Sequence, residues 1–406
     1  MVTRIEVTKT FEVDAPPAPE RISGGAGNEA MGTAIVVIGG KRFDKFISLT
    51  LVRSKEEATC SGDVKLSWPG AEMFNAQSPP AQEIVDGAEF KLYLDGQLAA
   101  SGQIDTRTSN GTPTNFELTL SFRGKCSDLV DSTPDHPTGQ ENNKSPAEVC
   151  RKLMEGYRPQ LIDKSGFSRQ MKRFIIAHGE SVERAMRRAT REFGLIFFEN
   201  VEGNCVLQKK GANEGQGQAL ILGGRNFFEW SVKRDMATRM SKIETKTYHL
   251  EDDDFYGKDA QQSGMSEDKS VKAKRERAVP VDGDHDQQTS NDRAVTESRR
   301  RSAQGINVTL KMSTWSDDSG RLWQVGKLHP VRIPVDQIND TLMINRVQFD
   351  LTPTERTATI TLVNRDTYDD KSTGGGGIDL SKEPDIPSIT SPDIRGGVWP
   401  ELPPAT

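Results

Sequence analysis

The chain has 406 residues, a formal net charge of −6, 34% hydrophobic residues and 28% charged residues. This length favours roughly two to four domains. The acidic balance argues against a protein whose main task is to bind nucleic acid, because such a protein presents a basic face to the phosphates. The low hydrophobic content indicates that much of the chain lies in exposed loops, arms or linkers.

The cysteines and the start of the chain exclude further classes. The four cysteines form no CxxC pair and have no histidine at ligand spacing, so the usual zinc patterns are excluded, and we expect free thiols of a protein made in the cytosol. The stretch from Met1 has no apolar core of a signal peptide, and no run approaches the roughly 18 apolar residues of a membrane span, so we expect no stable membrane insertion. The cysteines are Cys60, Cys126, Cys150 and Cys205.

Residues 1–33 are predicted to form an N-terminal arm. Apolar residues at odd positions, with polar residues between them, are typical of a strand with one apolar face. Prolines and a glycine run follow, so this strand has no hairpin partner nearby, and an isolated strand is not stable. We therefore expect residues 3–13 to add a strand to a sheet edge, in a neighbouring subunit. The candidate interface residues are Ile5, Val7, Phe11 and Val13.

Residues 34–130 are predicted to form a first small β-barrel domain. Short stretches alternate polar and apolar residues, as half-buried strands do. Asp95 and Gly96 are the residue pair of a two-residue hairpin turn. The expected strands are Ala34–Ile38, Phe46–Val52, Ala58–Trp68, Glu89–Leu94, Gln97–Arg107 and Asn115–Arg123.

Residues 131–215 change period and predict a compact α+β module. Ser145 and Glu148 form a capping box around a proline at the first helical position. A second helix starts at Ser181, carries apolar residues at helical spacing and ends at Gly194. Strands are expected at Arg173–Ala177, Leu195–Glu199 and Asn204–Gln208, the last two as a hairpin.

Residues 216–366 predict a second β-barrel domain with a polar insertion at 251–290. The insertion has eleven acidic and six basic side chains and no Ile, Leu or Trp, so burial cannot offset its ordering entropy and we expect it to be mobile. Asn291 is expected to cap a short helix that runs to Ala303. The expected strands are Ala219–Leu222, Phe228–Val232, Lys242–Tyr248, Ile306–Met312, Leu322–Val325, Pro330–Ile333, Leu342–Leu351 and Thr357–Val363.

The predicted fold class is thus α+β, mainly β, and residues 367–406 follow it as a Gly/Pro-rich tail. The run Gly374–Gly377 and six later prolines are typical of a hinge and an extended tether, with Trp399 as its anchor. A plain disordered tail fits the same composition.

The sequence contains no motif of a known catalytic or metal site. No histidine stands at metal-ligand spacing, Asp282–Asp286 lacks the ligand pattern of a calcium loop, and neither a nucleophile elbow nor a P-loop is present. We therefore predict no catalytic, cofactor-binding or metal-binding residue, and no cofactor. Arg293 and Arg299–Arg301 give a basic helical face that contacts nucleic acid or an acidic neighbour, or is simply solvated.

Four stretches, taken in order, resemble the tail hub proteins of Mu-like contractile phages, within the late-control-protein-D hub family. They are the strand with Gly102-Gln103-Ile104-Asp105-Thr106-Arg107, the strand exit Phe122–Asp131, the helix Glu180–Gly194, and the helix, strand and turn from Arg293 to Trp323. The likeness runs from residue 33 to residue 366, so the arm and the tail lie outside it. No lysozyme module or repetitive β-helical needle accompanies it.

The resemblance implies a structural protein of the virion and not an enzyme. Hubs of this family form homotrimers in which the two β-barrel domains of each chain alternate around a pseudo-sixfold ring. The resemblance therefore implies a baseplate protein, made in the host cytoplasm, that joins the tail tube or a tube initiator to a threefold spike protein. Such a hub contacts other baseplate proteins and lets DNA pass through its channel.

Other functions remain open at this stage. A phage tail and a related tailocin or injection machine fit the sequence equally well. A tail-associated enzyme that degrades cell wall or capsule is the main alternative, because a glycosidase can carry its two carboxylates without a short motif. A spike-tip protein that penetrates membranes is a further one.

Overall fold

The computed structural model describes most of the chain between the predicted arm and the predicted tail. The candidate interface residues Ile5, Val7, Phe11 and Val13 lie outside the described residues, as do Asp282–Asp286 and the whole tail with Trp399. None of the helices in the described part has the length and apolar character that crossing a membrane requires. The described residues are 34–43, 47–69, 84–209, 212–224, 226–248, 261–280, 287–303 and 305–364.

The described part of the first β region contains seven strands, and each of the six predicted strands has a counterpart among them. The predicted hairpin turn is confirmed: Asp95 and Gly96 have φ angles of 49° and 74°, both in the left-handed region that this turn requires. The strands are β1 (Ile35–Ile38), β2 (Lys41–Phe43), β3 (Ser48–Ser54), β4 (Ser61–Pro69), β5 (Glu89–Leu94), β6 (Gln97–Gly111) and β7 (Asn115–Gly124).

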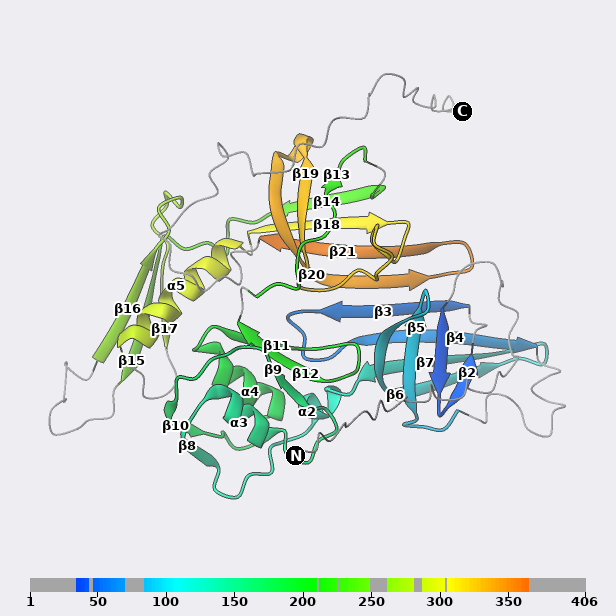
Figure 1. The fold of residues 1–406 in the computed structure, drawn as a ribbon, viewed down its shortest axis with the longest axis horizontal. Helices are drawn as coiled ribbons and strands as arrows, with labels where there is room; N and C mark the ends of the chain where they lie inside the picture. The colour runs from blue at the N-terminus through cyan, green and yellow to red at the C-terminus, as the bar shows by residue number, and fades with distance from the viewer. Residues whose placement is uncertain are drawn as a thin grey trace, which may run out of the picture.

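The helices of the central module lie together beside the main sheet (Figure 1), and they pack on a separate apolar core. The predicted capping box is confirmed, because Ser145 Oγ accepts the N–H of Glu148 at 3.3 Å and the Glu148 carboxylate accepts the N–H of Ser145 at 2.8 Å. Ser181 caps the next helix by accepting the N–H of Arg184. The elements are α2 (Ser127–Asp131), β8 (Gln140–Lys144), α3 (Pro146–Leu153), β9 (Leu161–Asp163), β10 (Met171–Ile175), α4 (Val182–Arg191), β11 (Leu195–Glu199) and β12 (Cys205–Lys209).

The second β region contributes the remaining strands of the main sheet. The strand predicted at Leu322–Val325 is not present; Leu322 makes only an isolated bridge to Ser316. The elements are β13 (Leu220–Ile221), β14 (Glu229–Arg234), β18 (Ile306–Met312), β19 (Leu328–Ile333), the 3-10 turn η2 (Pro334–Asp336), β20 (Ile338–Leu351) and β21 (Arg356–Asn364).

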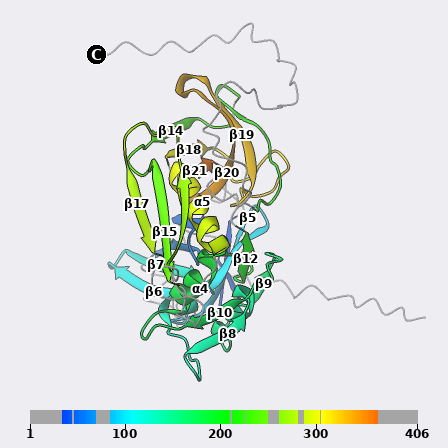
Figure 2. The same ribbon diagram turned by 90° about the vertical axis from the view of Figure 1, so that its left-hand side faces the viewer.

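The segment expected as a mobile insertion contains two strands in its described part. They flank one strand of a small separate sheet, antiparallel on one side and parallel on the other, so backbone hydrogen bonds supply what apolar side chains do not. A helix longer than predicted packs behind this sheet (Figure 2), and Thr245 Oγ1 donates to the carbonyl of Ser290 at 2.7 Å. The elements are β15 (Lys242–Tyr248), β16 (Gln261–Glu267), β17 (Glu276–Pro280) and α5 (Gln287–Ala303).

Among the described residues, the two β regions share one sheet of 13 strands. The mainly β character is confirmed, whereas the predicted closure into two barrels is not, since the described strands form no closed barrel. The sheet continues across the boundary because β20 pairs with two strands along one edge: Ile338–Met343 pair with β19, and Arg346–Leu351 pair with β3. The central path runs β14-β18-β21-β20-β3-β4-β7-β6-β5-β1-β2.

Candidate assembly interface

The two β regions meet where β3 runs antiparallel to the second half of β20 (Figure 1). Leu49 lies opposite Leu351, and Leu51 lies opposite Phe349. None of these four side chains is more than 7% exposed. Alternate residues of both strands therefore point into one shared core, and this core continues across the joint.

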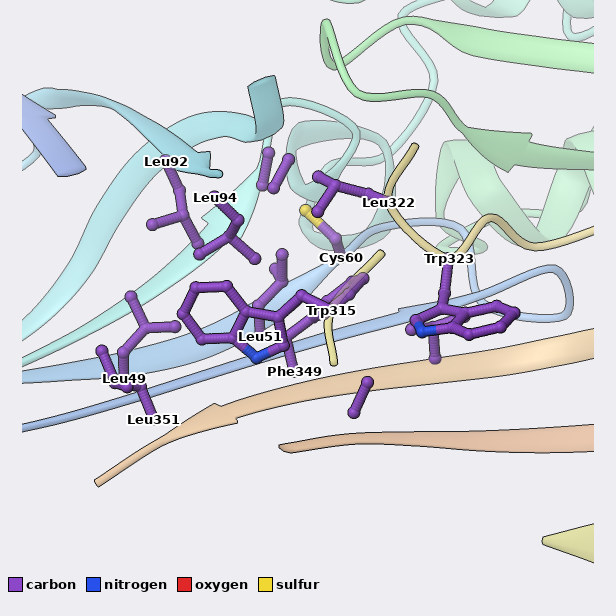
Figure 3. Packing of buried hydrophobic residues seen from close by; sticks show 14 of the residues in the cluster. Leu49, Leu51, Cys60, Leu92, Leu94, Trp315, Leu322, Trp323, Phe349 and Leu351 are labelled. Carbon is purple, nitrogen blue, oxygen red and sulfur yellow. The ribbon is translucent and has the colours of Figure 1, made fainter. Parts of the chain in front are cut away.

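Trp315 covers this face of the joint (Figure 3). It comes from the loop between β18 and β19, is fully buried, and lies in one apolar cluster with Leu92 and Leu94 of β5. Its indole N–H donates to the carbonyl of Thr357 at 3.0 Å, so its only polar atom is satisfied. Because β5 belongs to the first β region and Trp315 to the second, both regions contribute to the cover.

The hairpin turn between β5 and β6 also contacts the second β region at the joint. Asp95 in this turn forms an ion pair with Arg356 at the start of β21. The Arg356 guanidinium lies 4.1 Å from the ring centroid of Trp315, within reach of a cation–π contact. Gln97 Nε2 donates to the carbonyl of Gly320 at 2.8 Å. A turn of the first region thus docks on a loop of the second.

Lys55, which directly follows β3, is a buried cation at the same joint. Its Nζ donates to the carbonyl of Ala212 at 2.7 Å and lies 6.0 Å from the ring centroid of Phe198. Burial lowers the pKa of Lys55 to about 8, although the charge of Glu214 acts in the opposite direction. This side chain therefore ties the end of the central module and the segment after it to the joint.

Glu199 fixes the central module to the first β region. Its carboxylate, at the end of β11, accepts the N–H of Cys60 at 2.7 Å and the N–H of Cys126 at 2.8 Å. Burial raises the pKa of Glu199, and these two hydrogen bonds lower it in part. Gly124 makes room for the carboxylate, since a Cβ there would lie 1.8 Å from Glu199 Oε2.

The second β region repeats the strand order of the first. The order β3-β4-β7-β6-β5-β1 matches β14-β18-β21-β20-β19-β13, and the matching strands follow one another in the same order along the chain. The match weakens only at its end, where β13 is parallel to β19 while β1 is antiparallel to β5. Both β6 and β20 bulge at the same place, between Ile104 and Thr106 in one and between Ile344 and Arg346 in the other.

This repeat identifies two edges without a partner strand among the described residues. In the joint, β3 pairs with the second half of β20, residues 346–351. In the repeat, β14 takes the place of β3, and the second half of β6 takes the place of the second half of β20. Strand β14 pairs with β18 alone. Strand β5 stops opposite Gln103, and the N–H of Ile104 still donates to the carbonyl of Ala88 at 3.1 Å. Beyond this point, β7 is the one partner strand of residues 106–111 of β6 in the described part of the chain. In the described fold, β3 and β20 thus pair within the chain, whereas the corresponding strands β14 and β6 do not pair with each other.

Exposed apolar side chains gather around these two edges. Asp336, which follows Val335, accepts the indole N–H of Trp230 at 3.0 Å, so the η2 turn lies beside β14. Arg107 of β6 donates to the carbonyl of Ile84 at 3.1 Å, so residue 85 lies beside β6. Exposed apolar groups of this kind mark interaction sites. The exposed fractions are 66% for Val85, 54% for Phe228, 39% for Trp230, 51% for Met236 and 71% for Val335.

The basic face predicted for α5 is not a single exposed surface. Arg293 is buried, with Nε 3.3 Å from Glu192 Oε2 at the end of α4, and it also pairs with Glu297. Arg301 Nε lies 2.9 Å from Glu297 Oε1. Burial lowers the pKa of Arg293, whereas the two carboxylates act to raise it. These charges connect α5 to the central module.

The next candidates for a chemical site are the histidines and cysteines. In the described part of the chain no group of His, Cys, Asp and Glu is arranged to hold a metal ion. His329 is fully buried with Nδ1 2.9 Å from the carbonyl of Gln218, and burial lowers its pKa. His136 Nε2 lies 3.0 Å from Glu141 Oε1. All four cysteines are free and buried.

Comparisons with known proteins give a consistent result. Residues 126–209 match the family described as baseplate hub protein gp44-like, second domain. The baseplate hub protein gp44 of Escherichia phage Mu is 26% identical over 318 residues, which cover 76% of this chain and 81% of that protein.

Two solved structures have the same fold. The 43 kDa tail protein of prophage MuSo2 from Shewanella oneidensis matches with a TM-score of 0.71 and 20% identity, covering 83% of this chain and 99% of that one. The tail protein from Neisseria meningitidis MC58 matches with a TM-score of 0.69 and 16% identity, covering 82% and 97%.

These findings confirm the resemblance predicted from the sequence. The relative in phage Mu is named a baseplate hub, a structural protein, which supports the prediction that this chain is not an enzyme. Residues 126–209 are therefore similar to the second domain of the gp44-like baseplate hub proteins, and the chain is similar to the baseplate hub protein of phage Mu over most of its length.

Proposed function

We propose that three copies of this chain form a pseudo-sixfold ring that joins the tail tube to the threefold spike and leaves a channel for DNA. The main supporting observation is the repeat: each chain carries two β regions of one strand order, uses one joint between them, and leaves the matching pair of edges without a partner strand among the described residues. A contact between two different surfaces of identical chains closes into a ring when the rotation permits it. Three chains then supply six similar β regions.

The same proposal names the partners. One face of the ring meets the tube or a tube-initiator protein, the opposite face meets the spike, and other baseplate proteins surround it. DNA passes without being gripped, in agreement with the net charge of −6. The site of action is the virion baseplate, after synthesis in the host cytoplasm.

The ring predicts a molecular mass three times that of the chain. Light scattering coupled to size exclusion should give this mass for the purified protein, alone or together with its spike protein. Electron-microscopy projections should show a threefold ring with a central opening. A monomer under both conditions would contradict the proposal.

The N-terminal arm is expected to strengthen the assembly. If residues 3–13 add a strand to a neighbouring subunit, deleting residues 2–20 should lower the trimer fraction at a given concentration, because the paired backbone groups and apolar side chains are lost. Circular dichroism should stay unchanged, since the described β regions lie outside the deleted stretch. Deleting residues 378–406 provides the matched control and should leave the trimer fraction unaltered. Equal trimer fractions for the full chain and the arm deletion would rule out this role.

A further inference from the structure

Residue-by-residue pairing aligns the two β regions at the open edges. One row across the first region runs Leu49, Val64, Leu120, Arg107 through β3, β4, β7 and β6. The row in the same place of the second region runs Trp230, Leu310, Ile360, Val347 through β14, β18, β21 and β20. Trp230 thus corresponds to Leu49, and Arg107 corresponds to Val347.

We infer that the end of β6 in one copy pairs with β14 of the next copy in the register that β20 uses with β3. Within the chain, Leu351 lies opposite Leu49 and Phe349 opposite Leu51. The corresponding contacts between two copies are antiparallel. They place Gly111 opposite Trp230, Asn110 opposite Ser231, and Ser109 opposite Val232. This inference rests on the proposed ring and specifies its subunit contact.

Burial supports this pairing. In the joint within the chain, Leu49 is 1% exposed, whereas Trp230 at the corresponding place is 39% exposed. Strand β14 is exposed along nearly its whole length, and so is β6 from Asp105 onward. A neighbouring strand would cover both stretches and extend the sheet at each edge.

The opposed side chains are also compatible. Gly111 presents no side chain to the large indole of Trp230, so the two positions complement each other in size. Thr50 Oγ1 donates to Asp350 Oδ1 at 3.0 Å in the joint within the chain, and the corresponding pair, Ser231 and Asn110, can also form a hydrogen bond.

The one unfavourable pair, Arg107 opposite Arg234, has acceptors nearby. Arg107 Nη1 lies 3.9 Å from Asp86 Oδ1, and Arg234 Nη2 donates to the carbonyl of Asp336 at 2.6 Å. These oxygens offset the repulsion that two opposed cations would otherwise cause.

The neighbouring turns complete the correspondence. Within the chain, the β5–β6 turn contacts the start of β21 through Asp95 and Arg356, and Gln97 beside it donates to Gly320 of the β18–β19 loop. The corresponding contact between copies brings the η2 turn, with Val335, against the end of the β4–β5 connection, with Val85. These two are the most exposed large apolar residues among those described, at 71% and 66%. Their mutual burial would remove apolar surface from water.

Paired cysteines test the register in the full-length chain. Directly opposed residues of antiparallel strands have Cα atoms about 4.5–5.5 Å apart, within the roughly 4.4–6.8 Å that a disulfide spans. Ser109→Cys combined with Val232→Cys should shift the main band on a non-reducing gel from one chain to three linked chains after oxidation. Ser109→Cys with Ser231→Cys is the control and should stay at one chain, because Ser231 points to the other face. The native cysteines are buried and free, so they do not form these links.

The outcomes separate the register from the ring. A trimer by light scattering in which the first pair does not link, or links no better than the control, overturns the register and leaves the ring intact. A monomer overturns the ring itself. As a second measurement, Trp230→Glu should shift the mass from three chains to one, whereas Met265→Glu, at an even more exposed apolar residue away from both edges, should keep the trimer. A trimer in both variants also overturns the inferred contact.

Discussion

Replacing Glu199 with alanine should lower the free energy of unfolding by about 3–5 kcal/mol, because a buried acceptor of several hydrogen bonds is lost. The N–H groups of Cys60 and Cys126 both donate to this carboxylate, and both residues are buried. Urea denaturation measures the loss, and hydrogen exchange locates it: the two amides should exchange faster in the variant.

Glu202 provides a matched control on the same turn. It is exposed, so Glu202→Ala should change the free energy of unfolding by less than about 0.5 kcal/mol. A similar small effect for both variants would show that the Glu199 carboxylate does not hold the central module to the first β region.

The pH dependence of this difference has a defined sign. The pKa of Glu199 is raised in the folded protein above its ordinary value of 4.5, so the folded state holds the proton more strongly than the unfolded state. The resulting stabilisation is fully present below pH 4.5 and is lost as the pH rises through the raised pKa. The alanine variant lacks it, so the stability gap between the two proteins should narrow over that pH range.

Local rules predicted the individual elements well. The capping box at Ser145, the left-handed turn at Asp95-Gly96 and the alternating strands depend on neighbours within a few residues, and the sequence displays those neighbours directly. The strands at 261–267 and 276–280 were missed because their side chains are polar; their order comes from backbone pairing with β15, which periodicity does not reveal.

The joint between the two β regions could not be predicted in the same way. Alternation shows that Leu49 and Leu51 face a core, but it does not say which strand lies beside them. The sequence around Lys55 and Glu199 does not reveal that these charges are buried, since burial of a charge depends on partners far away in the sequence. The repeat was also hidden in the sequence. At the two matching bulges, the similar residue pairs are limited to Ile104 with Ile344 and Asp105 with Asn345. The one available signal for the open edge was Trp230, a large aromatic residue in a predicted strand with charged residues nearby.

The second large effect concerns Arg293, which joins α5 to the central module. Replacing it with alanine leaves Glu192 without its partner in α5 and removes one of the cations around Glu297. The side chains of all three residues are no more than 6% exposed, and breaking a buried ion pair from one side costs about 3–5 kcal/mol. We expect a loss of this size in thermal or urea unfolding, together with faster hydrogen exchange in α5.

Two further variants separate this effect from a general loss of positive charge. Arg300 is half exposed and lies 3.9 Å from Glu297. Changing it to alanine should lower the free energy of unfolding by less than about 1 kcal/mol. Changing Arg293 and Glu192 together to methionine should recover most of the stability lost in Arg293→Ala, because no buried carboxylate at position 192 is then left without its partner in α5. If the double variant is as unstable as Arg293→Ala, the loss comes from packing, and the ion pair is not what connects α5 to α4.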